Sequence, residues 1–257
     1  MVKKIAFING KGGCGKTTSI FHITGELVKR GKKVLVIDTD KQGNCTNSFL
    51  MNSAETKGSN VLEYFLNTKS FDEVVEHSLI VPKGKRNAVY TGIDILPATV
   101  ELENQELVSS SVDVKKRINE DCENYDFVLI DCPPSNKAIE TLVLEEIADK
   151  VLIPFSSDLD SVNGYGQLIE TVDNARLKNF DLEICGVFFS CFNKIRGTEQ
   201  ELREIMVSDC SSFIDVQIPN SSAIVDSRIN GKPICEYKKN SANAYIEKLV
   251  DVILERV

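Results

Sequence analysis

The sequence predicts an α/β protein whose mostly parallel sheet carries helices on both faces. Short runs rich in Val, Ile, Leu and Phe alternate with longer helical patterns along almost all of the 257 residues. Most of these runs are continuously apolar, as strands covered on both faces are, rather than alternating. A glycine-rich loop also joins the first run to the first helical pattern. Because no repeat or linker divides the chain, we predict one domain over residues 1–257.

The predicted elements follow one another in the order strand, helix, strand, which favours right-handed crossovers between parallel strands. The strands are expected at residues 4–8, 33–37, 93–96, 126–130, 150–153 and 183–189. The helices are expected at residues 17–30, 112–122, 137–148, 162–177, 199–207 and 242–255. We interpret the polar stretch 52–86, with two short helical pieces, as an excursion from the sheet.

Composition and charge exclude several classes of protein. The net charge is −8, yet residues 1–50 carry nine basic and three acidic side chains. This distribution excludes a wholly basic nucleic-acid binder and leaves room for a basic patch on an acidic body. No apolar run approaches the length of a membrane span, and the first residues resemble a strand rather than a signal peptide, so we expect a cytoplasmic protein. The eight cysteines contain no C-x-x-C pair, which favours reduced core thiols over a metal centre.

Residues 10–17 match the phosphate-loop pattern G-x-x-x-x-G-K-S/T between a predicted strand and a predicted helix. Glycines let successive backbone N–H groups turn toward phosphate oxygens at the positive end of the helix. Lys16 is expected to contact the β- and γ-phosphates, Thr17 to ligate Mg²⁺ and Thr18 to reach the α-phosphate. The predicted nucleotide contacts in this loop are Lys11, Gly12, Gly13, Cys14, Gly15, Lys16, Thr17 and Thr18.

Lys11 allows two interpretations on spacing alone. It is either a solvated loop lysine or a cation that reaches the nucleotide of a second subunit, as an arginine finger does.

Carboxylates follow two of the predicted strands. Asp38 and Asp40 end one strand and Asp131 ends another, ahead of two prolines. If the first of these strands lies beside residues 4–8, alternation places Asp38 and Asp40 on one face, toward the phosphate loop. One carboxylate would then hold the water shell of the metal and another would orient an attacking water.

These motifs resemble those of the ParA/MinD ATPases, and specifically of the ParA/Soj partition branch. Residues 11–18 look like the deviant Walker A motif K-G-G-x-G-K-T-T, and residues 131–135 look like D-x-P-P-S. Residues 38–44 are similar to D-x-D-P-Q-G-N, with Lys41 in place of the proline.

The resemblance implies a deviant Walker A P-loop fold that binds ATP and Mg²⁺ and forms a homodimer around ATP. Lys11 would contact the partner's nucleotide, Asp40 would position the hydrolytic water, Asp131 would be the Walker B carboxylate and Asp38 would lie near the metal. In this family the ATP dimer binds DNA without sequence preference, and a ParB-type centromere-binding partner stimulates hydrolysis. We therefore expect a nucleoid-associated ATPase, with slow basal turnover, that partitions chromosome or plasmid DNA.

The base-binding and DNA-binding residues are less clearly marked. Asn193 follows a strand and either contacts the base or simply forms a turn. Residues 218–221 look like the family's I-P-R-N, which implies base contacts from Pro219 and Ser221, but Asn220 replaces the arginine of the DNA-binding surface. The basic candidates that could compensate are Lys194, Arg196, Arg203, Arg228, Lys232, Lys238 and Lys239, and the first five are the predicted DNA contacts.

Other functions fit the sequence less well. A MinD-like membrane role calls for a basic amphipathic C-terminal helix, whereas residues 244–257 carry three acidic and two basic side chains. An iron–sulfur role needs paired cysteines, and no spacing of cysteines in the sequence indicates such a pair. A cargo-positioning switch that acts on a surface other than DNA stays open.

Overall fold

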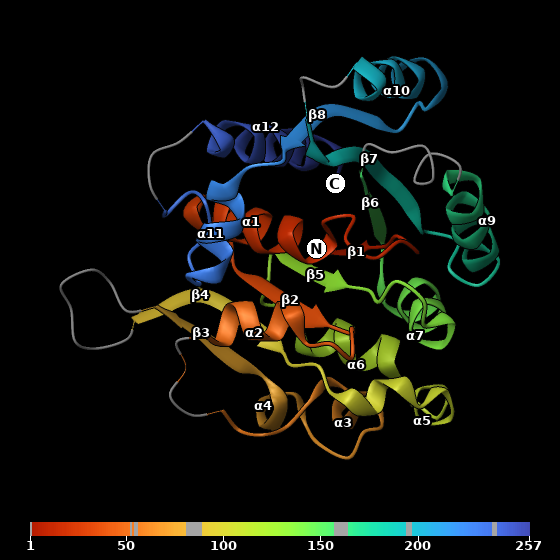
Figure 1. Cartoon of the computed structure of the whole chain (residues 1–257). Coiled ribbons are helices and arrows are strands. Elements are labelled where there is room, and N and C mark those ends of the chain that lie inside the picture. Colours follow the sequence, from red (N-terminus) through yellow and green to blue (C-terminus); the bar gives the residue numbers. More distant parts are fainter. Residues whose placement is uncertain are drawn as a thin grey trace.

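The computed structural model describes residues 2–51, 53, 56–80, 89–156, 164–193, 197–237 and 241–257. Its strands are β1 (Lys3–Phe7), β2 (Val34–Asp38), β3 (Glu76–Ile80), β4 (Val89–Leu96), β5 (Phe127–Asp131), β6 (Lys150–Ser156), β7 (Glu183–Phe192) and β8 (Phe213–Pro219). They form an eight-stranded sheet in the order β3-β4-β2-β5-β1-β6-β7-β8 (Figure 1). Every pairing is parallel except that of β3 with β4. The predicted fold class is confirmed.

Helices cover both faces of this sheet (Figure 1). One layer contains α1 (Lys16–Lys29), α2 (Asn44–Leu50), α11 (Ser222–Ile229) and α12 (Ala242–Arg256). The other contains α3 (Val61–Phe65), α4 (Phe71–Val74), η1 (Val100–Glu103), α5 (Gln105–Ser109), α6 (Val114–Asp121), α7 (Lys137–Leu142), the π-helical turn η2 (Val143–Ile147), α9 (Tyr165–Arg176) and α10 (Gly197–Asp209).

The central strands are continuously apolar because each contributes to two cores. In β1, Ile5 and Phe7 pack with α1, whereas Ala6 packs in the opposite core. Alternate side chains of a strand point to opposite faces, so burial of both faces requires apolar residues at every position. This physical requirement made the six predicted strands recognisable, and all six are present.

Two strands were missed, and both lie at the edges of the sheet. The interpretation of residues 52–86 as an excursion was wrong for β3, which pairs antiparallel with β4 and places His77 opposite Asp94. An edge strand has one open side and tolerates polar residues, so it lacks a continuous apolar run. The other missed strand, β8, alternates buried and more exposed residues for the same reason. The two short helical pieces expected in this stretch are α3 and α4.

The condition under which Asp38 and Asp40 were placed toward the phosphate loop, that β2 lies beside β1, is not met. β5 lies between β1 and β2, and β2 pairs with β5 and β4. The register of this pairing places Asp38 directly beside Asp131.

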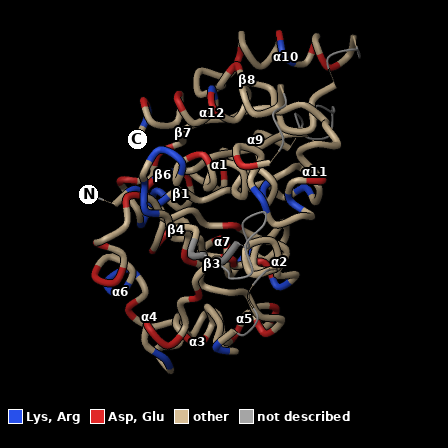
Figure 2. The backbone as a smooth tube through the Cα atoms, turned by 90° about the vertical axis from the view of Figure 1, so that its left-hand side faces the viewer, with Lys and Arg blue, Asp and Glu red and all other residues tan. Residues whose placement is uncertain are grey.

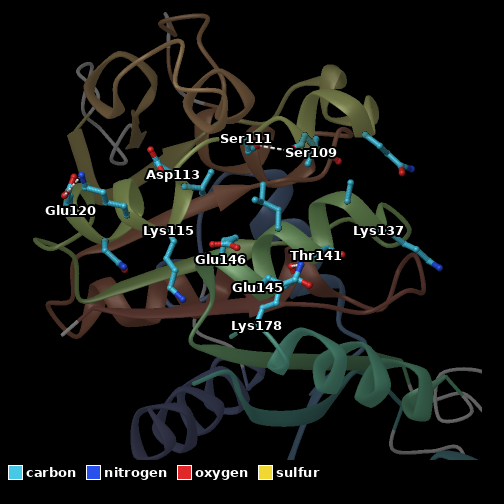
Figure 3. A pocket seen from close by; sticks show the side chains of 17 residues that line it. Ser109, Ser111, Asp113, Lys115, Glu120, Lys137, Thr141, Glu145, Glu146 and Lys178 are labelled. Atoms are coloured by element: carbon cyan, nitrogen blue, oxygen red, sulfur yellow. Dashed lines mark hydrogen bonds and ion pairs between the residues drawn. The ribbon is translucent and has the colours of Figure 1, made fainter. Parts of the chain in front are cut away.

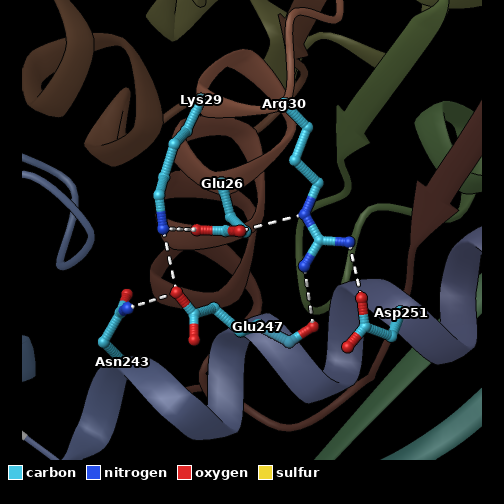
Figure 4. Close-up of polar contacts among 6 residues, drawn as sticks. All are labelled: Glu26, Lys29, Arg30, Asn243, Glu247 and Asp251. Atoms are coloured by element: carbon cyan, nitrogen blue, oxygen red, sulfur yellow. Dashed lines mark hydrogen bonds and ion pairs between the residues drawn. The ribbon is translucent and has the colours of Figure 1, made fainter.

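A polar network ties α1, the helix that follows the phosphate loop, to the C-terminal helix α12 (Figure 4). The buried Glu26 carboxylate accepts from Lys29 at 3.3 Å and from Arg30 at 2.9 Å. The same two cations reach Glu247 at 2.8 Å and Asp251 at 2.6 Å on α12. Because Glu26 is only 3% exposed, its charge is paired where water cannot compensate it. The network therefore fixes α1 against the end of the chain.

Candidate nucleotide site

The glycine loop between β1 and α1 has the backbone shape of a phosphate cradle. Gly13 and Gly15 adopt left-handed conformations, with φ of +78° and +86°. Such angles are open to glycine and strained for other residues. Gly15 is the N-cap of α1 and carries no side chain, so nothing of its own covers the first N–H groups of that helix. These groups and the helix dipole favour an anion at this point.

Lys16 and Asn9 hold the loop in this shape. The Lys16 side chain folds back over the loop and donates from Nζ to the carbonyl oxygen of Asn9 at 2.8 Å. The Asn9 amide donates to the carbonyl of Pro154 at 2.8 Å, and its oxygen accepts from the backbone N–H of Lys11 at 2.9 Å. Lys16 is 7% exposed. Its charge is therefore already placed over the concave side of the loop, and Thr18 is half-buried on the first turn of α1.

Thr17, Asp131 and Asp38 come together beside the loop. The Thr17 hydroxyl donates to Asp131 Oδ2 at 2.7 Å. Burial, together with the neighbouring charge of Asp38, raises the pKa of Asp131 to about 8. Burial likewise raises the pKa of Asp38 to about 6. Two buried carboxylates side by side repel each other, and a divalent cation between a hydroxyl and these oxygens would relieve that repulsion.

The residues present fit Mg²⁺. Among the residues that the structure describes, no three His, Cys, Asp or Glu side chains gather closely enough to form a metal cage. Mg²⁺ commonly keeps several waters and is held by one or two carboxylates with substrate phosphates rather than by such a cage. The donor set of Thr17 and Asp131 next to a phosphate loop is of that kind.

Asp38 and Asp40 do not form the equivalent pair that alternation along a strand predicted. β2 ends at Asp38, and Asp40 lies beyond it in the turn. Asp38 is fully buried and accepts from the Thr46 backbone and hydroxyl at 2.7 and 2.8 Å, and from the Asp40 N–H at 3.1 Å. Asp38 thus organises the turn, whereas the half-buried Asp40 lines a groove of about 290 Å³ beside Pro134.

Two contacts around this turn involve residues to which the sequence assigned no role. Lys41, which stands in place of the family's proline, forms an ion pair with Glu103 at 2.5 Å. The Thr46 hydroxyl also accepts from the backbone N–H of Ala98 at 3.0 Å and so joins the turn to the end of β4. No sequence motif marks Thr46, since its role depends on strands that meet only in the folded chain.

Lys11 is half-buried and lines a second groove. This groove has a volume of about 610 Å³ and runs from Gly10 and Lys11, past Pro134 and Glu140, to Leu168 of α9. Burial raises the pKa of Glu140. Lys11 and Gly10 line this groove, whereas the Lys16 side chain folds back to the carbonyl of Asn9.

The predicted base-side residues gather at the ends of β7 and β8. The register pairs Phe192 with Pro219, and the Asn220 N–H donates to the Phe192 carbonyl at 2.9 Å. Asn193 donates its own N–H to the buried Glu199 carboxylate at 2.6 Å. Ser221 is the N-cap of α11. The structure therefore brings Asn193, Pro219 and Ser221 to the end of the sheet at which the parallel strands finish, where the phosphate loop also lies.

The predicted DNA contacts divide into three groups. Arg203 forms a two-pronged pair with Asp215, from Nε to Oδ1 at 2.7 Å and from Nη2 to Oδ2. It lies on α10, where acidic residues outnumber basic ones (Figure 2). Arg228 and Lys232 are half-buried at the end of α11 and just beyond it. Lys194 and Arg196 lie outside the described residues, as do Lys238 and Lys239.

A larger groove, of about 1120 Å³, is separate from this site (Figure 3). It lies among α5, α6, α7 and η2, and Lys115, Glu146 and Lys178 are among its lining residues. None of the predicted site residues lines it.

Six of the eight cysteines are buried, including Cys14 in the phosphate loop, as expected for core thiols. In the described residues, no helix is both long and apolar enough to cross a membrane.

A left-handed glycine turn at a helix N-terminus, a buried lysine, and a threonine of the first helical turn bonded to an aspartate at a strand end define a P-loop nucleotide-binding protein. A family model described as an AAA domain matches residues 2–184. The chain is 30% identical to the chromosome-partitioning ATPase Soj of Treponema pallidum, over 100% of this chain and 98% of that protein. It is 29% identical to the sporulation initiation inhibitor protein Soj of Bacillus subtilis, over 96% and 95%. The chain belongs to the ParA/Soj family of partition ATPases.

Solved structures share the fold at lower identity. A complex of Cyanothece McdA with ATP superimposes with a TM-score of 0.82 at 23% identity, covering 100% of this chain and 97% of that one. A putative plasmid partition protein of Borrelia burgdorferi bound to AMPPNP gives 0.79 at 21% identity, with 100% of both chains covered. These similarities support the P-loop fold class.

Proposed function

We propose that this protein is a Mg²⁺-dependent ATPase that dimerises around ATP and partitions chromosome or plasmid DNA. The single observation that carries the proposal is the convergence of Lys16, Thr17 and Asp131 where the parallel strands β1 and β5 end, beside the glycine-rich loop. The similarity to Soj proteins and the ATP or AMPPNP bound in two structural neighbours support the choice of nucleotide.

Each residue of the site has a distinct chemical task in this proposal. Mg²⁺, held by Thr17 and through water by Asp131, would neutralise negative charge on the phosphates. Lys16 would exchange its bond to the Asn9 carbonyl for the β- and γ-phosphates. Asp40, half-buried at the rim of a groove, is free of the strand and would orient the attacking water. Asp38 would hold the turn that carries Asp40.

Lys11 supports the dimer. It lines the 610 Å³ groove beside its own loop, and a second copy of the chain would approach at this groove. A cation there would neutralise phosphate charge on the partner's nucleotide, in the way that an arginine finger acts in trans.

Binding to DNA is proposed for the ATP-bound dimer. Among the residues that the structure describes, Arg228 and Lys232 are the proposed contacts. Arg203 is a weaker candidate because Asp215 already neutralises it. With Asn220 at the family's arginine position, affinity should be weak and fall steeply with salt, since the contacts would be to phosphates. A ParB-type partner that stimulates hydrolysis, and association with the nucleoid in the cytoplasm, complete the proposal.

Sedimentation velocity tests the ATP-dependent dimer and its binding to DNA. The protein is run with ATP, with ADP, and with each nucleotide plus plain duplex DNA. We expect a dimer in Mg²⁺-ATP, a monomer in ADP and a faster species with DNA only in ATP. Lys16→Ala should remain monomeric throughout, whereas the exposed Lys33→Ala should behave as wild type. A wild-type protein that binds no ATP would refute the proposal. A dimer that ignores DNA at low salt would favour the cargo-positioning switch instead.

A further inference from the structure

A buried serine from the far half of the chain contacts the phosphate loop. Ser190, near the end of β7, is 2% exposed. Its hydroxyl donates to the backbone carbonyl of Cys14 in the loop, and lies 3.1 Å from the carbonyl of Phe155 in β6. A hydroxyl carries one proton and donates to one carbonyl at a time. The Cys14 carbonyl is the nearer of the two acceptors.

The direction of this bond has a consequence for the loop. The peptide between Cys14 and Gly15 is trans, since the described chain holds no cis peptide bond. In a trans peptide the C=O and the N–H point in opposite directions across a rigid plane. A carbonyl of Cys14 that is held against Ser190 therefore turns the Gly15 N–H away from β7. In a phosphate loop, backbone N–H groups that turn to the interior of the loop bind phosphate oxygens, and we assign the Gly15 N–H to this set.

Two further features show that β7 and the loop are built for close approach. A Cβ added to Gly15 would lie 2.8 Å from Ser190 Oγ and 3.0 Å from Ser190 Cβ, so only glycine fits. Cys191, the residue after Ser190, has a left-handed φ of 56°, which L residues adopt at an energetic cost. Strained backbone of this kind persists where the surrounding structure requires it, and here it accompanies the serine that contacts the loop.

We propose that Ser190 is a positioning residue of the nucleotide site, and that its hydroxyl fixes the Cys14–Gly15 peptide so that the Gly15 N–H faces the phosphates. The inference rests on the proposed function, because it assigns a role within the same site. Ser190 would act through the loop backbone, to which its hydroxyl bonds, and not on the reacting atoms. Without the hydroxyl, the buried Cys14 carbonyl loses its donor and the peptide is free to rotate, which weakens one phosphate contact.

The test compares Ser190→Ala with Ser78→Ala in the full-length protein. Ser78 is also buried and also donates to a carbonyl of another element, that of Phe49 at 2.8 Å, but it lies on the edge strand β3. Titration with Mg²⁺-ATP and Mg²⁺-ADP should give dissociation constants raised roughly tenfold by Ser190→Ala, and unchanged by Ser78→Ala. At saturating ATP, kcat should stay within roughly twofold of wild type, because the lost contact serves bound substrate and transition state alike.

A second pair of variants separates the hydroxyl from packing and covers the case in which Ser190→Ala does not fold. Ser190→Thr keeps the hydroxyl and adds a methyl group. Ser190→Val has the same shape as the Thr variant, with a second methyl group in place of the hydroxyl. We expect Thr to retain wild-type affinity and Val to lose roughly tenfold. The nucleotide-free Val variant should also melt at a lower temperature than the Thr variant, because the buried Cys14 carbonyl loses its donor. Equal affinities for the Thr and Val variants would overturn the role of Ser190. Failure of the wild type to bind ATP would instead refute the proposed function.

Discussion

Asp131→Asn should change how the stability of the nucleotide-free protein depends on pH. Burial raises the pKa of Asp131 to about 8, from 3.8 in an unfolded chain. Between pH 5 and pH 7 the folded state therefore holds a proton on this carboxyl that the unfolded state has released. Because the folded state binds more protons, the free energy of unfolding falls as pH rises. An amide at position 131 takes up no proton and removes this dependence.

The expected size follows from the same difference in protonation. One proton bound differently changes the free energy of unfolding by about 1.4 kcal/mol per pH unit. From pH 5 to pH 7 the variant should therefore gain about 3 kcal/mol relative to wild type. His22 acts in the opposite sense, because burial lowers its pKa to about 4 and stability rises with pH until its unfolded value of 6.5 is passed. That contribution is the same in both proteins and cancels in the comparison.

Urea unfolding at pH 5, 6 and 7 in EDTA, followed by circular dichroism, measures this difference. Asp126→Asn serves as the control, since its carboxylate precedes the same strand but is 46% exposed. The control should differ from wild type by a constant amount across the range. If Asp131→Asn also differs by a constant amount, Asp131 is not a buried carboxyl that holds its proton, and the metal-site reasoning fails with it. The same variant should lose Mg²⁺-dependent tightening of ATP binding.

Three further outcomes are expected. Lys11→Ala should bind nucleotide but lose hydrolysis, because the cation would act on the partner's phosphates; wild-type phosphate release would identify Lys11 as a surface lysine. Asp40→Ala should bind ATP and persist as a dimer, since only water positioning is removed, and light scattering that finds a monomer in ATP would contradict this. Gly25→Ala should lower the free energy of unfolding by roughly 1–3 kcal/mol, because the new Cβ would lie 2.1 Å from the ring of Pro233. Gly166→Ala, whose Cβ meets nothing within 4 Å, is its control in urea titrations.

Local sequence predicted the phosphate loop and the strands of the sheet centre. The loop shape depends on neighbouring residues, since Gly13 and Gly15 supply the left-handed angles and Lys16 folds back seven residues to Asn9. Strands buried on both faces are continuously apolar and leave a signal at every position. The resemblance to ParA/MinD motifs rests on the same contiguous residues, which is why it was visible without a structure.

The edge strands and the order of the sheet were decided by long-range pairing. β3 and β8 are partly polar because one side of each is open, and hydrophobic patterning does not mark such strands. The insertion of β5 between β1 and β2 cannot be read from either strand, since all three are equally apolar. This order places Asp38 beside Asp131 and leaves Asp40 in the turn.

The sequence by itself determined which chemical groups are available for the site: a glycine-rich loop, a lysine, a threonine, and three carboxylates at or just after strand ends. Only the tertiary structure decided which polar groups contact one another and which are already paired with other residues. It neutralised Arg203 with Asp215, turned Asp38 to Thr46, and brought Ser190 to a carbonyl 176 residues away. The physical reason is that hydrogen bonds and ion pairs act over a few ångströms of space, whatever the distance along the chain.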